Sequence, residues 1–326
     1  MIRTPICDLF GIQHPIVLGG MGAPNTSPEI VAAVCNAGGL GVLGCSGRRP
    51  ADVVELVRRI RDLTDRPFGL NLLLFMDEQE TLDAMIAAQP EVLSFAWPRP
   101  EQPLGDVFAR SHGSGARVMH MVSQVPEAAR AAEADADVIV AQGSEGGGHV
   151  GTMGTLALVP MVVDAVSPAP VIAAGGIADG RGLAAALALG AAGALLGTRF
   201  VASNEAPQAL WAKEAIVASD GHDTDLTEIP DIISGRVWPG AFARAWRNEL
   251  MRKWAGREWE VRQRRAEIAA GVAASREAGD AQGVPLLFGQ DAGLISSIEP
   301  AGEIVARIVH EAEAILDSNA GLSRAR

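Results

Sequence analysis

Two glycine groups are the residues of this chain whose type and spacing point most directly to chemistry. Gly175 and Gly176 follow a short apolar run, and Gly197 and Thr198 follow the next one along the chain. Glycine has no Cβ, so backbone N–H groups in such loops can approach a phosphate closely. In (β/α)8 barrels, the loops after strands seven and eight commonly form a phosphate site. The pair therefore predicts a phosphorylated ligand at the carboxyl-terminal face of a barrel.

A histidine preceded by three glycines is the main candidate for catalysis. His149 comes directly after Gly147 and Gly148, just beyond another apolar run. Histidine is the natural proton carrier near neutral pH, so we assign His149 as the candidate catalytic residue. Gly147 and Gly148 are candidate cofactor-binding residues. Two alternatives stay open: a histidine in an ordinary surface loop, and a metal site that uses Glu145 and His149. No third ligand for such a site lies nearby in sequence, and His120 at the end of the fifth predicted strand could supply one.

Two further groups of residues are candidates for contact with a planar ligand. Gly20, Met21 and Gly22 follow the first apolar run, where they either form a simple tight turn or line a flat ring. Asn71 and Gln142 lie within or at the end of apolar runs, so their amides must find hydrogen-bond partners. Each amide either bonds a neighbouring strand or faces the barrel mouth and contacts the edge of a heterocycle.

Strands and helices must alternate along the chain to position these residues. Segments of helical periodicity separate eight apolar runs, a pattern that predicts a parallel sheet of the size of a (β/α)8 TIM barrel. A doubly wound open sheet is the alternative. The predicted strands are Pro15–Leu18, Leu40–Leu43, Phe68–Leu74, Val92–Phe95, Arg117–Met121, Asp137–Ala141, Val171–Ala174 and Ala194–Leu196.

The pattern changes in the last third of the chain. We predict a ligand-binding barrel over residues 1–221, a helical insertion over 222–285, and a returning loop with the closing helix of the barrel over 286–326. Within the insertion, residues 241–279 look like a long charged helical stretch that carries three tryptophans. Such helices outside a barrel often mediate self-association, so a homodimer is one expectation, and the sequence leaves the oligomeric state open.

Composition limits the possible partners. The net charge of −12 argues against nucleic acid and acidic membranes, which leaves a small-molecule substrate. Cys7, Cys35 and Cys45 form no metal-binding or disulfide pattern, and the first residues do not resemble a signal peptide, so we expect a cytoplasmic protein without a metal. Lys213 and Lys253, the two lysines, lie away from predicted strand ends, which argues against a Schiff-base enzyme.

Six segments resemble the nitronate monooxygenase family, formerly called 2-nitropropane dioxygenases, and occur in the same order. They are residues 15–21, 36–41, 68–71, 146–149, 174–180 and 196–200, so the resemblance covers nearly the whole chain. The family also includes flavin-dependent enoyl-acyl-carrier-protein reductases and NADH:quinone reductases.

The resemblance implies a TIM barrel with FMN at its carboxyl-terminal mouth and His149 near the flavin edge. The residues that would hold the FMN phosphate are Gly175, Gly176, Gly197 and Thr198, and those that would line the isoalloxazine ring are Met21, Gly22, Asn71 and Gln142. Residues 289–293 resemble the family's returning loop over the flavin. Met121 stands where many relatives have Lys or Gln, so one polar contact is either missing or supplied by His120. The chain also has no tyrosine, although tyrosines mark one class of nitronate monooxygenase.

Three functions follow from these observations. The first, which is the function we predict, is an FMN-dependent nitronate monooxygenase that converts nitronates and dioxygen into carbonyl compounds and nitrite; the other two are alternatives. The second is an FMN reductase of quinones or enoyl thioesters, with NAD(P)H as a transient reductant. The third is a non-catalytic barrel that binds a phosphorylated metabolite.

Overall fold

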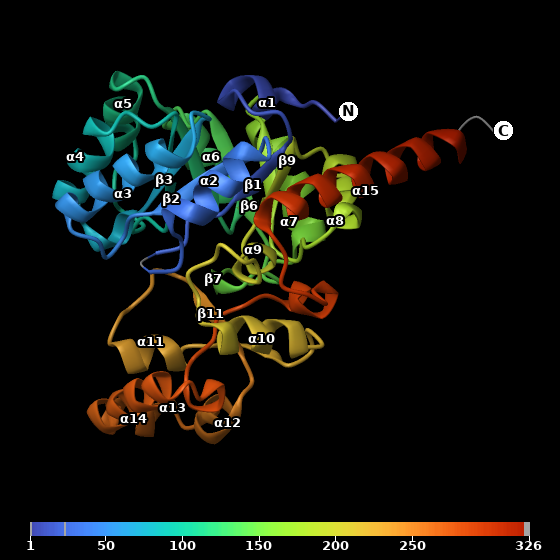
Figure 1. Ribbon diagram of the computed structural model, residues 1–326. Helices are drawn as coiled ribbons and strands as arrows, with labels where there is room; N and C mark the ends of the chain where they lie inside the picture. The colour runs from blue at the N-terminus through green and yellow to red at the C-terminus, as the bar shows by residue number, and fades with distance from the viewer. Residues whose placement is uncertain (1, 23, 323–326) are drawn as a thin grey trace.

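Eight parallel strands form a closed barrel in the computed structural model, which describes residues 2–22 and 24–322 (Figure 1). This confirms the predicted TIM barrel. The strands follow one another around the barrel in chain order, and the last pairs with the first. They are β1 (Ile16–Leu18), β2 (Leu40–Gly44), β3 (Phe68–Leu73), β4 (Val92–Ala96), β5 (Arg117–Val122), β6 (Val138–Gln142), β8 (Val171–Ala174) and β9 (Gly193–Leu196).

Alternation along each strand divides the buried residues between two cores. Val42, Met119 and Val140 fill the barrel interior, where they share a cluster with Ile6 and Phe10 of helix α1 (Pro5–Phe10). Helix α1 therefore contributes to the packed interior of the barrel. The strand residues that alternate with these point outward and pack against the surrounding helices in a larger cluster.

Helices connect successive strands around the outside of the barrel (Figure 1). Several begin with proline in the first turn, where its missing N–H costs no hydrogen bond. None of the described helices is both long enough and apolar enough to cross a membrane. The outer helices are α2 (Pro28–Asn36), α3 (Pro50–Leu63), α4 (Gln79–Ala87), α5 (Gly105–Gly113), α6 (Val125–Glu133), α7 (Thr155–Val166), α8 (Gly180–Ala188) and α15 (Ala301–Leu322).

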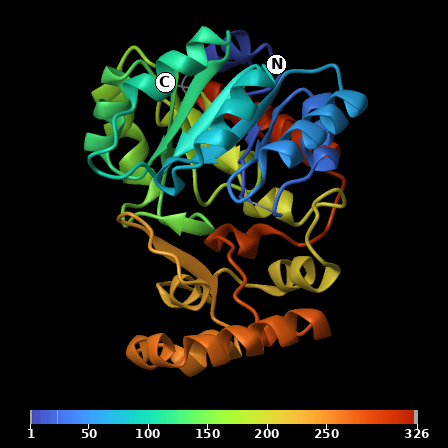
Figure 2. The ribbon, with the colours of Figure 1, turned by 90° about the vertical axis from the view of Figure 1, so that its left-hand side faces the viewer.

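Residues 222–285, called the cap below, pack beyond the carboxyl-terminal end of the barrel (Figure 2). The cap has its own small apolar core, formed in part by Ile229, Trp254 and Ile268. Short elements α9 (Thr198–Val201) and α10 (Leu210–Ala218) precede it in the chain, and η3 (Gln290–Leu294) follows it. The elements of the cap are β10 (Thr224–Thr227), α11 (Ile229–Ser234), β11 (Phe242–Trp246), α12 (Glu249–Trp254), α13 (Glu258–Gln263), α14 (Arg265–Ala278) and η2 (Ala281–Gly283).

The cap contains strands as well as the expected helices. Strand β11 lies between β10 and β7 (Gly148–Val150) in a three-stranded antiparallel sheet. Residues 242–246 were expected to be helical, and that expectation is wrong. Their strand conformation depends on pairing with β7, a segment about ninety residues earlier, and local periodicity carries no information about such distant pairing. This pairing joins the cap to the loop that carries His149.

Candidate functional site

The loops after β8 and β9 leave backbone exposed to a ligand. Gly175 and Gly176 adopt left-handed φ angles of 94° and 77°. A Cβ on Gly175 would lie 2.7 Å from the carbonyl oxygen of Gly143, and one on Gly176 would lie 3.1 Å from Cβ of Glu145. A Cβ on Gly197 would meet nothing within 4 Å, so open space adjoins this loop. Only glycine fits at Gly175 and Gly176, and open space adjoins Gly197; these two loops, called the cradle below, are the candidate phosphate site.

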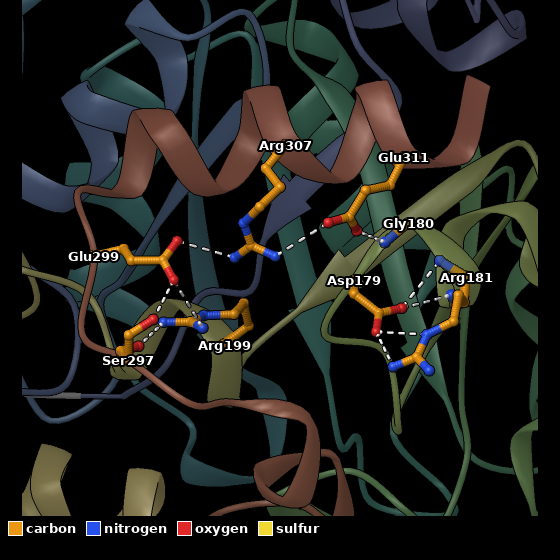
Figure 3. Close-up of polar contacts among 9 residues, drawn as sticks. Asp179, Gly180, Arg181, Arg199, Ser297, Glu299, Arg307 and Glu311 are labelled. Atoms are coloured by element: carbon orange, nitrogen blue, oxygen red, sulfur yellow. Dashed lines mark hydrogen bonds and ion pairs between the residues drawn. The ribbon is translucent and has the colours of Figure 1, made fainter. Parts of the chain in front are cut away.

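The closing helix α15 contacts the start of α8, four residues after Gly176 (Figure 3). Glu311 accepts a hydrogen bond of 2.9 Å from the backbone N–H of Gly180, the first residue of α8. Asp179 caps the same helix by accepting from the N–H groups of Arg181 and Gly182. The loop between Gly176 and α8 is therefore held in one position by two carboxylates.

Arg199 anchors the second loop in the same network (Figure 3). Its side chain is buried and donates to the carbonyl oxygens of Ala202 and Ser297. Burial lowers the pKa of the Arg199 guanidinium, and nearby Glu299 opposes that shift. Glu299 also accepts from Arg307 of α15 at 3.0 Å. Arg199 therefore supports the loop and does not face a ligand.

The amide residues and the first glycine loop lie at the same end of the barrel: Gln142 pairs with Ala174 on β8, and the N–H of Gly19 donates to the carbonyl oxygen of Leu196 on β9. A Cβ on Gly20 would lie 2.4 Å from Cβ of Asn71, so the Gly20 backbone closely covers that side chain. Asn71 donates from Nδ2 to Oγ of Ser94 at 3.2 Å, so its amide forms a hydrogen bond to the neighbouring strand β4. Oε1 of Gln142 is buried without a hydrogen-bond partner. Because a buried carbonyl without a donor is costly, Gln142 fits a ligand that offers an N–H group.

The remaining members of the predicted ring-binding set lie beside Gly20. Met21 is partly buried against the main core, and its carbonyl oxygen accepts from Oγ1 of Thr26 at 3.1 Å. Gly22 is partly exposed, with its nearest neighbour, the carbonyl oxygen of Ser46, 3.7 Å from a built Cβ. The first loop therefore leaves room above the barrel for a flat group.

The loop between β6 and α7 is folded tightly against its neighbours. Glu145 accepts from both the N–H and the hydroxyl of Thr155, so it caps α7. A Cβ on Gly147 would lie 2.5 Å from Cα of Phe288 in the returning segment. Gly148 has a φ of 79° and no neighbour within 4 Å of a built Cβ. Glu145 is thus committed to a helix terminus and Gly147 to a close contact with Phe288, whereas open space adjoins Gly148.

His149 is held by two residues of the cap. Its Nε2 lies 2.8 Å from Oδ1 of Asp231 in α11, and both side chains are 12% exposed. Its ring stacks on the indole of Trp238, with centroids 3.4 Å apart and planes 10° from parallel. A carboxylate only accepts, so Nε2 carries the proton and Nδ1 offers a lone pair. The pair is suited to moving a proton at Nδ1, with the ring orientation fixed by Asp231.

His120 takes no part in this site. Its ring lies 5.5 Å from the ring of Phe108 on α5, so it points outward into the helix layer. Burial lowers the pKa of His120 to about 3, so the ring is neutral. Among the described residues no group of three His, Cys, Asp or Glu side chains could hold a metal ion. The suggested roles of His120 as a flavin contact or as a metal ligand are both wrong.

Thr198 of α9 contacts the returning loop, residues 289–293, which carries Asp291. Oγ1 of Thr198 accepts from the N–H of Gly289 at 2.9 Å. Asp291 is fully buried beside Thr198, and burial raises the pKa of its carboxyl to about 7. Thr198 therefore links the phosphate cradle to residues 289–291.

The structure brings the predicted residues to one end of the barrel, and it adds four residues that sequence reasoning missed. Those four are Asp231, Trp238, Phe75 and Trp97. Phe75 and Trp97 follow β3 and β4, and strand-end position is a signal that could have identified them. Asp231 and Trp238 lie on the cap, where no local pattern marks them.

Glycine loops, a buried amide acceptor and a histidine at the carboxyl-terminal end of the strands place the candidate site where TIM-barrel enzymes carry their active sites. The family model described as "Nitronate monooxygenase" matches residues 3–89 and 78–311. The chain belongs to this family of flavin-dependent oxidoreductases. The open cradle and the unpartnered Gln142 oxygen fit a flavin, because its phosphate and ring N–H groups supply what each lacks.

Several relatives span much of the chain. A (3aS,4S,5R,7aS)-5-hydroxy-7a-methyl-1-oxo-octahydro-1H-indene-4-carboxyl-CoA dehydrogenase of Rhodococcus jostii is 38% identical over 72% of this chain and 65% of its own length. The structure of FabK from Thermotoga maritima has a TM-score of 0.87 and 35% identity, covering 99% of this chain and 100% of that one. A nitroalkane oxidase structure from Streptomyces ansochromogenes has a TM-score of 0.82 and 29% identity, covering 96% and 99%.

Proposed function

We propose that this chain is an FMN-dependent oxidoreductase that acts at the carbon–carbon bond beside the carbonyl group of an acyl thioester. A nicotinamide nucleotide would exchange electrons with the flavin. The observation that carries this proposal is the contact of 2.8 Å between Nε2 of His149 and Oδ1 of Asp231. A carboxylate behind an imidazole stabilises its protonated form and holds one tautomer, as a group that transfers protons requires.

Proton transfer separates the candidate reactions. Reduction of an enoyl thioester adds two electrons and a proton to one carbon and a second proton to the carbon beside the carbonyl. Oxidation of a nitronate starts from an anion that has already lost its proton. The His149–Asp231 pair therefore favours a thioester over a pre-formed nitronate. The name of the Rhodococcus relative, a carboxyl-CoA dehydrogenase, supports a thioester substrate.

The residues of this chain would divide the work as follows. Gly175, Gly176, Gly197 and Thr198 would hold the FMN phosphate, and Gln142 with the loop at Gly20–Gly22 would contact the ring. Bound FMN supplies two-electron transfer. Asp231 keeps the proton of His149 on Nε2, so Nδ1 exchanges a proton with the carbon beside the thioester carbonyl. Because His149 is only 12% exposed, bulk water has little access to that proton.

Nitronate oxidation is the second candidate. The nitronate monooxygenase family model and the likeness to the nitroalkane oxidase structure over 96% of the chain favour it. In that reaction His149 would orient the anion or remove the α-proton of a neutral nitroalkane.

An anaerobic visible spectrum of the FMN-loaded protein tests the proposal. NADH, NADPH and propyl-2-nitronate are added to separate cuvettes, and crotonyl-CoA is then added to any cuvette in which the flavin is bleached. We expect a nicotinamide nucleotide to bleach the flavin and crotonyl-CoA to restore its colour. Bleaching by the nitronate alone, with no response to either nucleotide or to the thioester, would establish the second candidate instead.

A further inference from the structure

The indole of Trp238 lies in a compartment made of three aromatic rings, called the aromatic box below. His149 stacks on one face of the indole at 3.4 Å. The ring of Phe75 lies 4.8 Å away at 50°, and the ring of Trp97 lies 6.2 Å away at 86°. Tilted and edge-on neighbours at these distances are favourable arrangements for a flat ring. The box is therefore shaped for a planar group placed directly against the proton-transfer histidine.

The walls of the box are held by bonds that do not involve Trp238. Trp97 has a φ of 54°, a left-handed conformation that is unusual for a bulky residue. The N–H of Phe75 donates to the carbonyl oxygen of Trp97 at 3.0 Å, which ties the loops after β3 and β4 together. Such backbone strain concentrates at ligand sites, because the surrounding structure must support it. The two fixed walls thus belong to the barrel, whereas their occupant belongs to the cap.

Trp238 itself is held mainly by these ring contacts. It lies in the connection between α11 and β11, between two glycines with left-handed φ angles, Gly235 at 73° and Gly240 at 70°. Its neighbour Val237 is 85% exposed. Nε1 of Trp238 is buried and has no hydrogen-bond partner, a cost that weakens its hold on the box. The indole can therefore leave the box without disturbing the barrel interior or the apolar core of the cap.

We infer that the aromatic box is an acyl-binding subsite for a ring-containing acyl group, and that Trp238 occupies it until the substrate displaces it. This inference rests on the proposed function, because it takes the thioester to be the part of the substrate beside His149. No substrate ring can fit between His149 and Trp238 at 3.4 Å, so entry requires displacement. A short linear acyl group would not use the box and would not need to displace the indole.

Binding to the oxidised FMN-loaded protein without a reductant tests the inference, because no turnover occurs. Calorimetry compares cinnamoyl-CoA, whose acyl group is flat and aromatic, with crotonyl-CoA, whose acyl group is short and linear. The variants are Trp238→Ala, which removes the occupant, and Phe75→Ala, which removes a wall. Trp259→Phe is the matched control, because Trp259 is 61% exposed on α13. Trp238→Leu serves as a second variant that keeps apolar volume without a flat ring.

We expect Trp238→Ala to lower the Kd of cinnamoyl-CoA about tenfold. The ligand no longer has to break the one or two aromatic contacts that hold the indole of Trp238 in the box. The same variant should change the Kd of crotonyl-CoA less than about twofold. Phe75→Ala should weaken cinnamoyl-CoA about tenfold. Trp238→Leu should follow Trp238→Ala in direction, and Trp259→Phe should match the wild type.

Two further outcomes separate this inference from the proposed function. Weaker binding of cinnamoyl-CoA to Trp238→Ala would show that Trp238 is a wall of the substrate site and would overturn the inference, even if crotonyl-CoA is turned over. Free indole should bind Trp238→Ala and not the wild type, since it refills the box. Indole binding without any flavin response to thioesters would support the subsite and overturn the proposed thioester chemistry.

Discussion

Asp291 makes the stability of this protein depend on pH, and Asp291→Asn should remove that dependence. Burial raises the pKa of this carboxyl from its usual 3.8 to about 7. Below pH 3.8 the folded and unfolded chains both carry the proton, so no penalty exists. Between these two pKa values the unfolded chain ionises and the folded chain does not, so stability falls as pH rises. Above the folded pKa the penalty is constant.

The size of the effect follows from the two pKa values. Each pH unit between them costs about 1.4 kcal/mol, which gives about 3 kcal/mol between pH 5 and pH 8. The asparagine amide does not titrate and retains an oxygen that can accept from the hydroxyl of Thr198. Relative to the wild type, Asp291→Asn should therefore gain about 3 kcal/mol of unfolding free energy between pH 5 and pH 8.

Urea unfolding of the FMN-free protein at several pH values measures this difference, with the slope of the transition as a check on the unfolded state. Asp65→Asn is the matched control, because Asp65 is exposed and should leave the pH profile unchanged. Parallel profiles for the wild type and Asp291→Asn would refute the reasoning. They would mean that the folded protein solvates the carboxylate of Asp291 as well as water does.

Three further predictions concern the site. Asp231→Asn should lower kcat by about 10²–10⁴-fold, because an amide N–H that faces Nε2 of His149 holds the wrong tautomer. Steady-state kinetics measure this loss, and Asp225→Asn on the neighbouring strand β10 is the control. Gly176→Ala should raise the Kd of FMN about tenfold, because the left-handed φ of 77° at Gly176 is unfavourable for alanine. Gly113→Ala on α5 is the control and should leave the Kd unchanged. Quenching of FMN fluorescence measures both Kd values. Arg236→Gln should raise KM for CoA thioesters several-fold at low salt, since this exposed cation lies two residues before Trp238 and CoA carries phosphates. An equal change in Arg276→Gln, which is exposed on α14, would count against a specific contact.

The barrel could be predicted from sequence because its rules are local. Strands buried on both faces appear as short apolar runs, and all eight predicted runs overlap strands of the barrel. The glycine loop after β8 could be predicted for the same reason, because the left-handed φ angles of Gly175 and Gly176 require glycine at a fixed place after a strand.

The orientation of side chains could not be predicted in the same way. His120 and Met121 are neighbours on β5, and alternation sends one outward to the helices and the other toward the barrel interior. The sequence shows that His120 and Met121 point to opposite faces of the strand, but it does not show which of the two points into the barrel. A shift of a single residue in register exchanges the two orientations, so the sequence left open whether His120 faces the barrel mouth or the surrounding helices.

The same reasoning explains why Asp231, the partner of His149 in the proposed proton transfer, could not be identified from sequence. His149 and Asp231 are 82 residues apart, and their contact depends on the antiparallel pairing of β7 with β11. The glycine loops after β8 and β9 are constrained by their own backbone, whereas the position of Asp231 depends on how the cap packs against β7. The residues that would hold the cofactor thus belong to the barrel and can be read from sequence. The residues that orient His149 and cover its ring belong to the cap, so variation in the cap can change the substrate without disturbing the cofactor site.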